Sequence, residues 1–520
     1  MMMTAIEQTV GQLFVVGFHD TKVNDEIRTM IRDYHVGGVI LFARNVENAG
    51  QLAQMTNDLQ AEAKAAGYAT PLLICMDQEN GVIRRLAEGA AALPGAMTIA
   101  ATGSPDNAEA MYGLCGSELA QVGVNWDLAP DADVNNNPDN PVIGTRSFGD
   151  DPKAVAQYVQ AAVQGLQGQN VTACLKHFPG HGNTAVDSHL GLPVIERSLA
   201  DLEKVELIPF GQGIKAQAAS VMAAHIVFPA LDEKFPASLS AAFLHDMLRD
   251  QLGYQGLVVT DDLEMLAIAD HYGTAAACVT AIKNGADMVM VSHTQATQIA
   301  AIEAVVEGLH RGLITASQIE AAATRVQAQQ RQFGRWNNGF ESQAFAAMVA
   351  DHQQQANQVY QASVTGVIEH LNLKPERHVV VVTLTNQTLA NVVDLRGPES
   401  VLVNAVKQQT ANMTPVFIDT TATDPVQQLP PMTADDAVII ATTNVKSTQD
   451  VQALVVQACL DQTQAVAVIA MRNPYDRQYL PANLAAYLVT YENTPYAVDL
   501  AVASLYGQAH LSGHLPVRLP

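Results

Sequence analysis

Up to about residue 300, the chain alternates between short apolar segments and longer segments with helical periodicity. The apolar segments lie at 13–18, 37–42, 71–77, 123–130, 172–178, 220–226, 256–262 and 286–292. The stretches between them, such as 48–67 and 151–169, have the spacing of amphipathic helices. Strands that are apolar throughout and alternate with helices pair in parallel and are covered on both faces. Eight such units predict a (β/α)8 TIM barrel.

After about residue 315 the pattern changes. Two stretches rich in Gln and Ala, 316–334 and 341–371, are predicted to be helices that leave the barrel. A new series of apolar runs follows at 378–384, 401–406, 415–420, 437–443, 465–471 and 485–491. We therefore predict a barrel domain over 1–340, a helical linker over 341–375 and a smaller α/β sandwich domain over 376–520. The second domain lacks GxGxxG and GxxxxGK(S/T), so we expect it to be structural rather than nucleotide-binding.

The chain is acidic, with 28 Lys and Arg against 52 Asp and Glu and a formal net charge of -24. This charge argues against nucleic acid or an anionic membrane surface as a partner, and it leaves the oligomeric state open. The five cysteines are scattered without CxxC spacing, which predicts free thiols in a reducing compartment. No secretory leader and no apolar run of about 20 residues is evident, so we expect a cytoplasmic protein.

Polar residues gather where the predicted barrel strands end. They are Asp77, Asp127, Lys176, His177, His225, Asp261, Asp262, Ser292 and His293. In a (β/α)8 barrel the carboxyl ends of the strands meet at one rim, where active sites are built. The sequence therefore predicts a site at this rim.

The stretch CLKHFPGHGNTAVDSHLGL, at 174–192, allows three interpretations. A metal site is disfavoured because Pro179 and Gly180 prevent His177 and His181 from sharing a helical face, and no further ligand set completes it. A Schiff base at Lys176 requires a lowered pKa, whereas the surrounding aspartates are expected to keep the amine protonated. A charged lysine that binds a polyhydroxy ligand fits these neighbours better.

The third interpretation is a catalytic loop. Gly180 and Gly182 supply backbone freedom, and Asp187 and His189 are spaced so that their side chains approach each other in an extended segment. A carboxylate beside an imidazole fixes its tautomer and raises its pKa, which suits a general acid and base near neutral pH.

Two further segments add carboxylates and guanidinium groups to the rim. In GLVVTDDLEM, alternation along the strand predicts that only one of Asp261 and Asp262 faces the barrel mouth, where a carboxylate could act as a nucleophile. Asp77 with Arg85, and Arg146 on the loop after the fourth strand, supply the paired hydrogen bonds that hold vicinal hydroxyls. Together these groups predict a sugar site.

These segments carry a family resemblance. KHFPGHGNTAVDSHLGLP, at 176–193, is similar to the signature of family 3 glycoside hydrolases, in particular their β-N-acetylglucosaminidase branch. MDQENGVIRRL resembles another segment of that family, and GGVILFARN, VIGTRSFG, VMAAHIVFPALD and LVVTDDLEMLAI follow its order. The resemblance spans about residues 8–340. The second domain, with RNPYD at 472–476, resembles the sandwich domain of two-domain members.

The resemblance implies a retaining exo-β-N-acetylglucosaminidase that needs no metal or cofactor and acts on a small carbohydrate, such as a cell-wall fragment. It assigns Asp261 as the nucleophile, His189 as the acid/base and Asp187 as its partner. It assigns contacts with the terminal sugar to Asp77, Arg85, Arg146, Lys176, His177, Met222 and His225. The chain departs from the family at Asn80, where the family has Gly, and at Val82, where it usually has Arg. These departures concern the subsite beyond the cleaved bond.

Other activities stay open from the sequence. Within the family these are a β-glucosidase or β-xylosidase and an N-acetylglucosaminide phosphorylase. Outside it they are a Schiff-base aldolase built on Lys176 and a sugar-binding barrel without catalysis.

Overall fold

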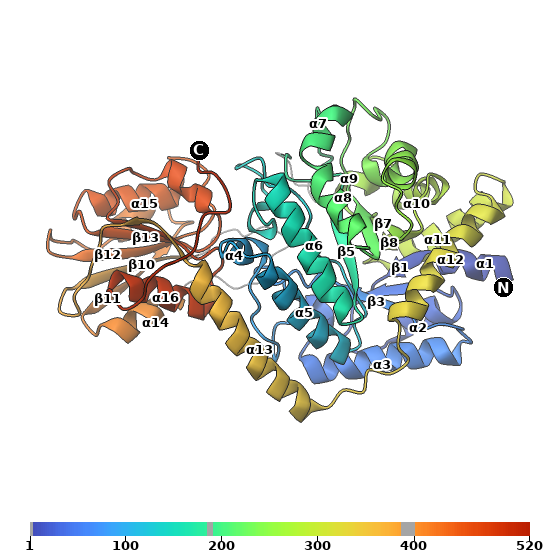
Figure 1. Ribbon diagram of the computed structural model, residues 1–520, viewed down its shortest axis with the longest axis horizontal. Helices are drawn as coiled ribbons and strands as arrows, with labels where there is room; N and C mark the ends of the chain where they lie inside the picture. Colours follow the sequence, from blue (N-terminus) through green and yellow to red (C-terminus); the bar gives the residue numbers. More distant parts are fainter. Residues whose placement is uncertain (1–3, 185–190, 386–400) are drawn as a thin grey trace.

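A computed structural model describes residues 4–184, 191–385 and 401–520, in which two α/β domains lie side by side (Figure 1). Within these residues eight parallel strands close into a barrel in the order β1 to β8, with β8 pairing with β1. The strands are β1 (Phe14–Val16), β2 (Gly38–Ile40), β3 (Leu73–Met76), β4 (Trp126–Asp127), β5 (Thr172–Phe178), β6 (Ser220–Ala223), β7 (Leu257–Asp262) and β8 (Met288–Val291). The TIM-barrel prediction is confirmed.

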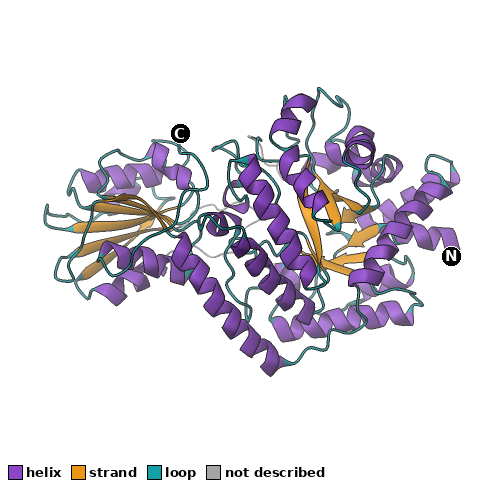
Figure 2. Ribbon diagram, viewed as in Figure 1, coloured by secondary structure: helices purple, strands orange, loops and turns teal. Residues whose placement is uncertain are grey.

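Helices surround the barrel strands (Figure 2). They are α1 (Ala5–Gly11), α2 (Asp25–Arg32), α3 (Ala49–Ala65), α4 (Ala96–Ala100), α5 (Asp106–Gln121), α6 (Pro152–Gly168), α7 (Leu199–Lys204), α8 (Leu207–Lys215), α9 (Leu266–Ala269), α10 (Thr274–Lys283), α11 (Gln295–His310) and α12 (Ala316–Phe333). Short 3-10 turns are η1 (Ala43–Asn45), η2 (Gly144–Arg146) and η3 (Ala237–Leu239), and η4 (Ala242–Gln251) is a longer π-helical segment. None of the helices in the described ranges has the length and apolar character needed to span a bilayer.

Local sequence explains where several of these helices begin. Asp151 caps α6 by accepting hydrogen bonds from the backbone N–H groups of Lys153 and Ala154, and Pro152 occupies the first turn, where no N–H is needed. Asn48 caps α3 in the same way through the N–H of Gln51. The barrel strands are buried almost throughout, which explains why they are apolar rather than alternating.

The second domain follows α13 (Ser342–Ser363), the yellow helix that joins the two domains in Figure 1. Its sheet has the order β11-β10-β12-β13-β14-β9 and is parallel except for the β14–β9 pair. The strands are β9 (Thr365–Glu369), β10 (Val379–Thr385), β11 (Met413–Asp419), β12 (Ala437–Thr442), β13 (Val466–Ala470) and β14 (Ala486–Val489). Helices α14 (Val401–Gln409), α15 (Val451–Leu460) and α16 (Pro495–Leu505) cover its two faces, and η5 (Pro425–Gln428) and η6 (Pro474–Tyr479) are short turns (Figure 2).

Two segments of the second domain differ from the sequence analysis. Strand β9 lies inside the stretch 341–375, which was expected to be a helical linker, so the end of that stretch belongs to the second sheet. The apolar run at 401–406 begins helix α14 rather than a strand. A run this short does not distinguish a strand from a helix, and the buried positions Leu402, Ala405 and Val406 follow helical spacing.

The second domain contacts the barrel loops that follow β3 and β4. The hydroxyl of Tyr475 accepts a hydrogen bond of 2.9 Å from the side-chain amide of Asn135. The carboxylate of Glu492 accepts hydrogen bonds from the N–H of Gly95 and the hydroxyl of Thr98. The second domain therefore packs against the two loops that follow β3 and β4 at the carboxyl end of the barrel.

Candidate active site

A cavity of about 740 Å³, open to solvent, lies at the carboxyl ends of the barrel strands. It is lined by Ile40, Phe42, Asp77, Glu79, Ile83, Arg85, Leu128, Val142, Arg146, Lys176, His177, His181, Met222, Asp261, Asp262, Met265, Met290, Ser292 and His293. Most of the site residues predicted from the sequence are in this set. The structure therefore brings together residues that lie more than 200 positions apart in the chain.

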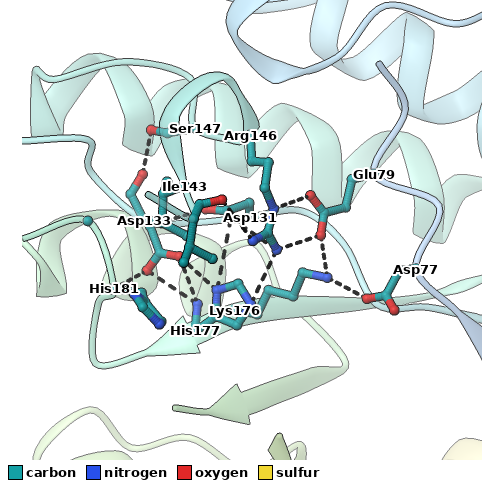
Figure 3. A network of polar contacts seen from close by, with 12 residues as sticks. Asp77, Glu79, Asp131, Asp133, Ile143, Arg146, Ser147, Lys176, His177 and His181 are labelled. Carbon is teal, nitrogen blue, oxygen red and sulfur yellow. Dashed lines mark hydrogen bonds and ion pairs between the residues drawn. The ribbon is translucent and has the colours of Figure 1, made fainter. Parts of the chain in front are cut away.

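Lys176 lies at the centre of a buried charge network (Figure 3). Its ammonium nitrogen is 2.7 Å from Asp77 Oδ1 and 2.6 Å from Glu79 Oε1, and its side chain is only 2% exposed. Burial by itself would lower the pKa of Lys176, but the carboxylates of Asp77 and Glu79 outweigh it and raise the pKa. The amine is therefore charged, as the sequence analysis expected.

Glu79 links this lysine to Arg146. The guanidinium of Arg146 donates from Nε to Glu79 Oε2 at 2.9 Å and from Nη2 to Oε1 at 2.8 Å (Figure 3). Burial opposes ionisation of Glu79, but Arg146 and Lys176 hold the pKa of its carboxyl below the ordinary value. On the outer side, Arg85 Nη2 lies 3.6 Å from Asp77 Oδ2. The result is a fixed array of donors and acceptors along one wall of the cavity.

His177 is oriented by Asp133. Its Nδ1 lies 2.8 Å from Asp133 Oδ2, and its Nε2 lies 3.4 Å from Arg146 Nη2. Burial would raise the pKa of Asp133, but His177 lowers it, so the carboxylate is ionised and accepts the Nδ1 proton. Asp133 also accepts a hydrogen bond from the backbone N–H of His181. The imidazole of His177 thus presents a fixed tautomer at the cavity.

His181 borders the network, because its backbone N–H donates to Asp133. Burial and the neighbouring His177 lower the pKa of His181 to about 4, so this ring is neutral at physiological pH. The side-chain amide of Asn140 donates to the carbonyls of His181 and Gly182 and holds the start of the segment. Asp187 and His189, predicted to be the acid/base pair, lie outside the described residues, so their roles stay predictions.

Asp261 and Asp262 both border the cavity, whereas strand alternation predicted that only one would. The reason is an irregularity in the pairing of β7 with β8 between Val259 and Asp262, which interrupts the alternation of side chains. Asp261 Oδ1 accepts the backbone N–H of Asp262 at 2.8 Å. Asp262 Oδ1 accepts the N–H of Glu264, so this second carboxylate holds the loop that follows the strand.

The two remaining predicted sugar-binding residues differ in position. Met222 lines the cavity. His225 is fully buried and is not among the lining residues. Its Nδ1 lies 2.7 Å from Ser238 Oγ and its Nε2 lies 2.9 Å from the backbone carbonyl oxygen of Asp262. His225 therefore contacts the backbone at the end of β7.

Three carboxylates of this network, Glu79, Asp131 and Asp133, were not singled out from the sequence. Glu79 follows Asp77 by two residues, a spacing that puts both on one side of an extended chain, and this signal was available. Asp131 and Asp133 share the same spacing after β4. Their roles depend on partners from β5 and its following loop, which local sequence does not identify.

Asp131, Asp133 and His177 are close enough together to be considered as metal ligands. However, Asp133 and His177 Nδ1 already bond to each other, and Arg146 Nη2 lies 3.7 Å from Asp131 Oδ2. A metal ion at this place would have to displace the proton shared by His177 and Asp133, and it would lie beside the positive charge of Arg146. The arrangement is that of a hydrogen-bond network around His177, and we assign no metal to it.

Comparisons with known proteins find relatives in sequence and in structure. Residues 5–329 match the model of the glycosyl hydrolase family 3 N terminal domain. Beta-hexosaminidase A of Pseudoalteromonas piscicida is 38% identical over 287 residues, which are 52% of this chain and 48% of that protein. This chain therefore aligns with about half the length of that relative.

Two solved structures are similar over nearly the whole chain. A glycoside hydrolase family 3 beta-N-acetylglucosaminidase from Paenibacillus sp. str. FPU-7 aligns with a TM-score of 0.90 and 32% identity over 99% of each chain. A fungal multi-domain GH3 beta-N-acetylglucosaminidase aligns with a TM-score of 0.92 and 33% identity, over 99% of this chain and 61% of that one. Both domains of the present chain are thus shared with these relatives.

Proposed function

The chain belongs to glycosyl hydrolase family 3, and we propose that it is a retaining exo-β-N-acetylglucosaminidase. In this proposal it hydrolyses terminal, non-reducing, β-linked N-acetylglucosamine from cell-wall fragments or other glycans. The names of the relatives with similar sequence and of the structures with the same two domains support the hexosaminidase activity. The cell-wall substrate and the cytoplasmic location rest on the amino-acid sequence alone. With that substrate, the enzyme would take part in peptidoglycan recycling.

The observation that supports the proposal most directly is the charge network on one wall of the cavity. A terminal sugar offers several hydroxyl groups, each of which both donates and accepts. Asp77 supplies acceptors, while Arg85, Arg146 and Lys176 supply donors, all at fixed positions. Because these groups are already paired and ionised, a sugar can bind without first reorganising them.

In the proposed mechanism, a carboxylate oxygen of Asp261 attacks the anomeric carbon. His189, oriented by Asp187, gives its proton to the glycosidic oxygen as the bond from that oxygen to the anomeric carbon breaks. Water, deprotonated by His189, then attacks the glycosyl-enzyme and releases the sugar with net retention. The imidazolium that donates the proton is cationic and the imidazole that later accepts one is neutral, so neither form experiences with the anionic nucleophile the repulsion that a second carboxylate would.

Turnover of an aryl N-acetylglucosaminide by Asp261→Asn tests the nucleophile. We expect a loss in kcat of at least about 10³-fold, because the amide cannot form the covalent ester. Asp25→Asn, a change at a fully exposed carboxylate, is the control and should leave turnover unchanged. Near-normal turnover by Asp261→Asn would contradict the mechanism.

The acid/base role is tested with His189→Ala and Asp187→Asn. Loss of acid catalysis should affect substrates with poor leaving groups more than those with good ones. Equal losses across a series of leaving groups would contradict the role. Product analysis with added phosphate should give free N-acetylglucosamine, whereas a sugar-1-phosphate would identify a phosphorylase, and faster turnover of aryl glucosides would identify a glucosidase.

A further inference from the structure

The cavity has two chemically different halves. The charged wall of Asp77, Glu79, Arg146, Lys176 and His177 comes from β5 and from the loops after β3 and β4. The lining residues that follow β2, β7 and β8 include two aromatic rings and a thioether, namely Phe42, His293 and Met265. In the closed barrel these three side chains lie on the part of the rim that follows β7, β8 and β2, and the charged wall lies on the part that follows β3, β4 and β5.

The two halves also differ in depth. The side chains of Lys176 and Glu79 are 2% and 5% exposed, whereas that of His293 is 44% exposed. A terminal sugar held by the charged wall therefore lies at the deep end of the cavity. The remainder of a longer substrate has to leave past the exposed half.

His293 is held in place at this exposed half. Its backbone N–H donates to the carboxylate of Glu264 at 2.5 Å, and its carbonyl oxygen lies 3.1 Å from His19 Nε2. Its ring Nε2 lies 3.1 Å from Asp262 Oδ2. In the neutral form of the imidazole, the carboxylate favours the tautomer with the proton on Nε2, in which Nδ1 carries a lone pair. Within the described ranges no hydrogen bond to this Nδ1 is present.

Phe42 extends the same surface. Its ring centroid lies 5.2 Å from that of His293, with the two planes inclined by 31°. The guanidinium carbon of Arg44 lies 4.2 Å from the Phe42 centroid. Two rings supported in this way form a shallow aromatic shelf at the mouth, and the C–H face of a pyranose is apolar enough to pack on such a shelf.

We propose that Phe42 and His293 form the subsite for the sugar on the leaving-group side of the cleaved bond. Asp262 is a positioning residue, since it orients the His293 ring, and Nδ1 accepts a hydrogen bond from a hydroxyl of that second sugar. The ligand class is a saccharide residue rather than a peptide or a lipid. This inference rests on the proposed N-acetylglucosaminidase function and adds a specificity site to it.

The test compares His293→Ala and Phe42→Ala with the unchanged enzyme in two measurements. With the β-1,4-linked disaccharide of N-acetylglucosamine as substrate, kcat/KM should fall by roughly 10–100-fold for each variant. The inhibition constant of free N-acetylglucosamine, which occupies only the deep end, should change by less than about 2-fold. His310→Ala removes another exposed histidine paired with a carboxylate, Glu7, and should change neither value.

Three outcomes decide against the proposal or its premise. If the inhibition constant of N-acetylglucosamine rises in parallel with the loss on the disaccharide, His293 and Phe42 belong to the terminal-sugar site and the proposal fails. If the loss for His293→Ala on aryl substrates grows as the leaving group becomes poorer, His293 is an acid catalyst and the proposal also fails. If the unchanged enzyme hydrolyses no N-acetylglucosaminide, the proposed function itself fails.

Asp262→Asn provides the readout for positioning. Asparagine keeps an acceptor oxygen but also carries donor hydrogens, so it no longer selects one tautomer of His293. We expect kcat/KM on the disaccharide to fall less in Asp262→Asn than in His293→Ala. When Asp262→Asn is added to His293→Ala, we expect no further fall in kcat/KM. Additive losses would mean that Asp262 acts independently of His293.

Discussion

The ammonium nitrogen of Lys176 lies 2.6 Å from a carboxylate oxygen of Glu79, and both groups are almost completely buried. The same oxygen also accepts a hydrogen bond from Arg146. Glu79 therefore compensates two buried cations. Without it, Lys176 would keep only Asp77 as a close carboxylate partner and Arg146 would lose both of its hydrogen bonds to Glu79. The geometry of the charged wall depends on this carboxylate as much as on the residues that are proposed to contact a sugar.

Replacing Glu79 by Gln should lower both activity and stability. A neutral amide leaves the cations of Lys176 and Arg146 partly uncompensated, and breaking a buried ion pair costs about 3–5 kcal/mol of unfolding free energy. We expect kcat/KM on an aryl N-acetylglucosaminide to fall by about 10²-fold as the wall loses its geometry. Urea unfolding and steady-state kinetics measure the two effects.

The matched control for this change is Glu62→Gln. Glu62 also bridges two cations, Arg28 and Arg32, but these arginine side chains are 36% and 53% exposed. Surface pairs contribute about 0–1 kcal/mol, so this variant should retain its activity and most of its stability. Similar small losses in both variants would show that Glu79 has no special role.

The charged state of Lys176 makes it a poor nucleophile for carbonyl compounds. Because its carboxylate neighbours raise its pKa, the neutral amine is rarer than in an ordinary lysine at pH 7. Treatment with a small aldehyde and borohydride should label exposed lysines such as Lys204, whose side chain is 72% exposed, and leave Lys176 unmodified. Peptide mass spectrometry identifies the labelled lysines. Preferential labelling of Lys176 would support the Schiff-base aldolase interpretation.

Gly182 allows the start of the predicted catalytic segment to approach the loop after β4. A Cβ atom at this position would overlap the backbone carbonyl oxygen of Val134, the residue next to Asp133. Gly182→Ala should therefore push apart the two segments that Asp133 joins, and a displacement near 1 Å can cost about 10²-fold in rate. The measurement is kcat/KM together with the melting temperature.

Gly211→Ala is the comparison for this variant. Gly211 lies within α8, and no atom lies within 4 Å of the place its Cβ would occupy. Alanine in a helix interior adds about 0.5–1 kcal/mol of stability relative to glycine, and activity should not change. Full activity of Gly182→Ala would show that the two segments are not required to stay in contact.

Asp476 should make the stability of the second domain depend on pH. Burial raises the pKa of this carboxyl to about 7 from an ordinary value of 3.8. Between these values the folded protein keeps a proton that the unfolded chain releases, so the unfolding free energy falls as pH rises. At ~1.4 kcal/mol for each pH unit the loss reaches about 4 kcal/mol near pH 7 and then levels off.

Asp476→Asn removes this titration and keeps an acceptor for the backbone N–H of Val445. We expect the variant to be more stable than the unchanged protein, by a margin that is larger at pH 8 than at pH 5. Denaturant unfolding at the two pH values measures it, with the exposed Asp461→Asn as the control. A margin that does not change with pH would mean that Asp476 is already ionised in the folded protein at pH 5.

The sequence by itself determined the barrel and predicted a set of polar residues, most of which line the cavity at its rim. Continuous apolar runs separated by helices specify parallel strands, because a strand covered on both faces has no polar side. The carboxyl ends of such strands meet at one rim, so Asp77, Lys176, His177 and Asp261 could be assigned to one site before any contact was known. The pattern in the second domain was less decisive, since the apolar run at 401–406 is too short to distinguish the spacing of a strand from that of a helix.

Only the tertiary structure decided which groups pair with one another. Glu79 between Lys176 and Arg146, Asp133 beneath His177, and Asp262 beside His293 are all pairs from different strands or loops. The interruption of β7 that brings both aspartates to the cavity arises from its pairing with β8. Periodicity records how one segment is buried, whereas an ion pair or a hydrogen bond depends on a distance between segments. That distance is set by the closure of the whole barrel and by no local stretch of the chain.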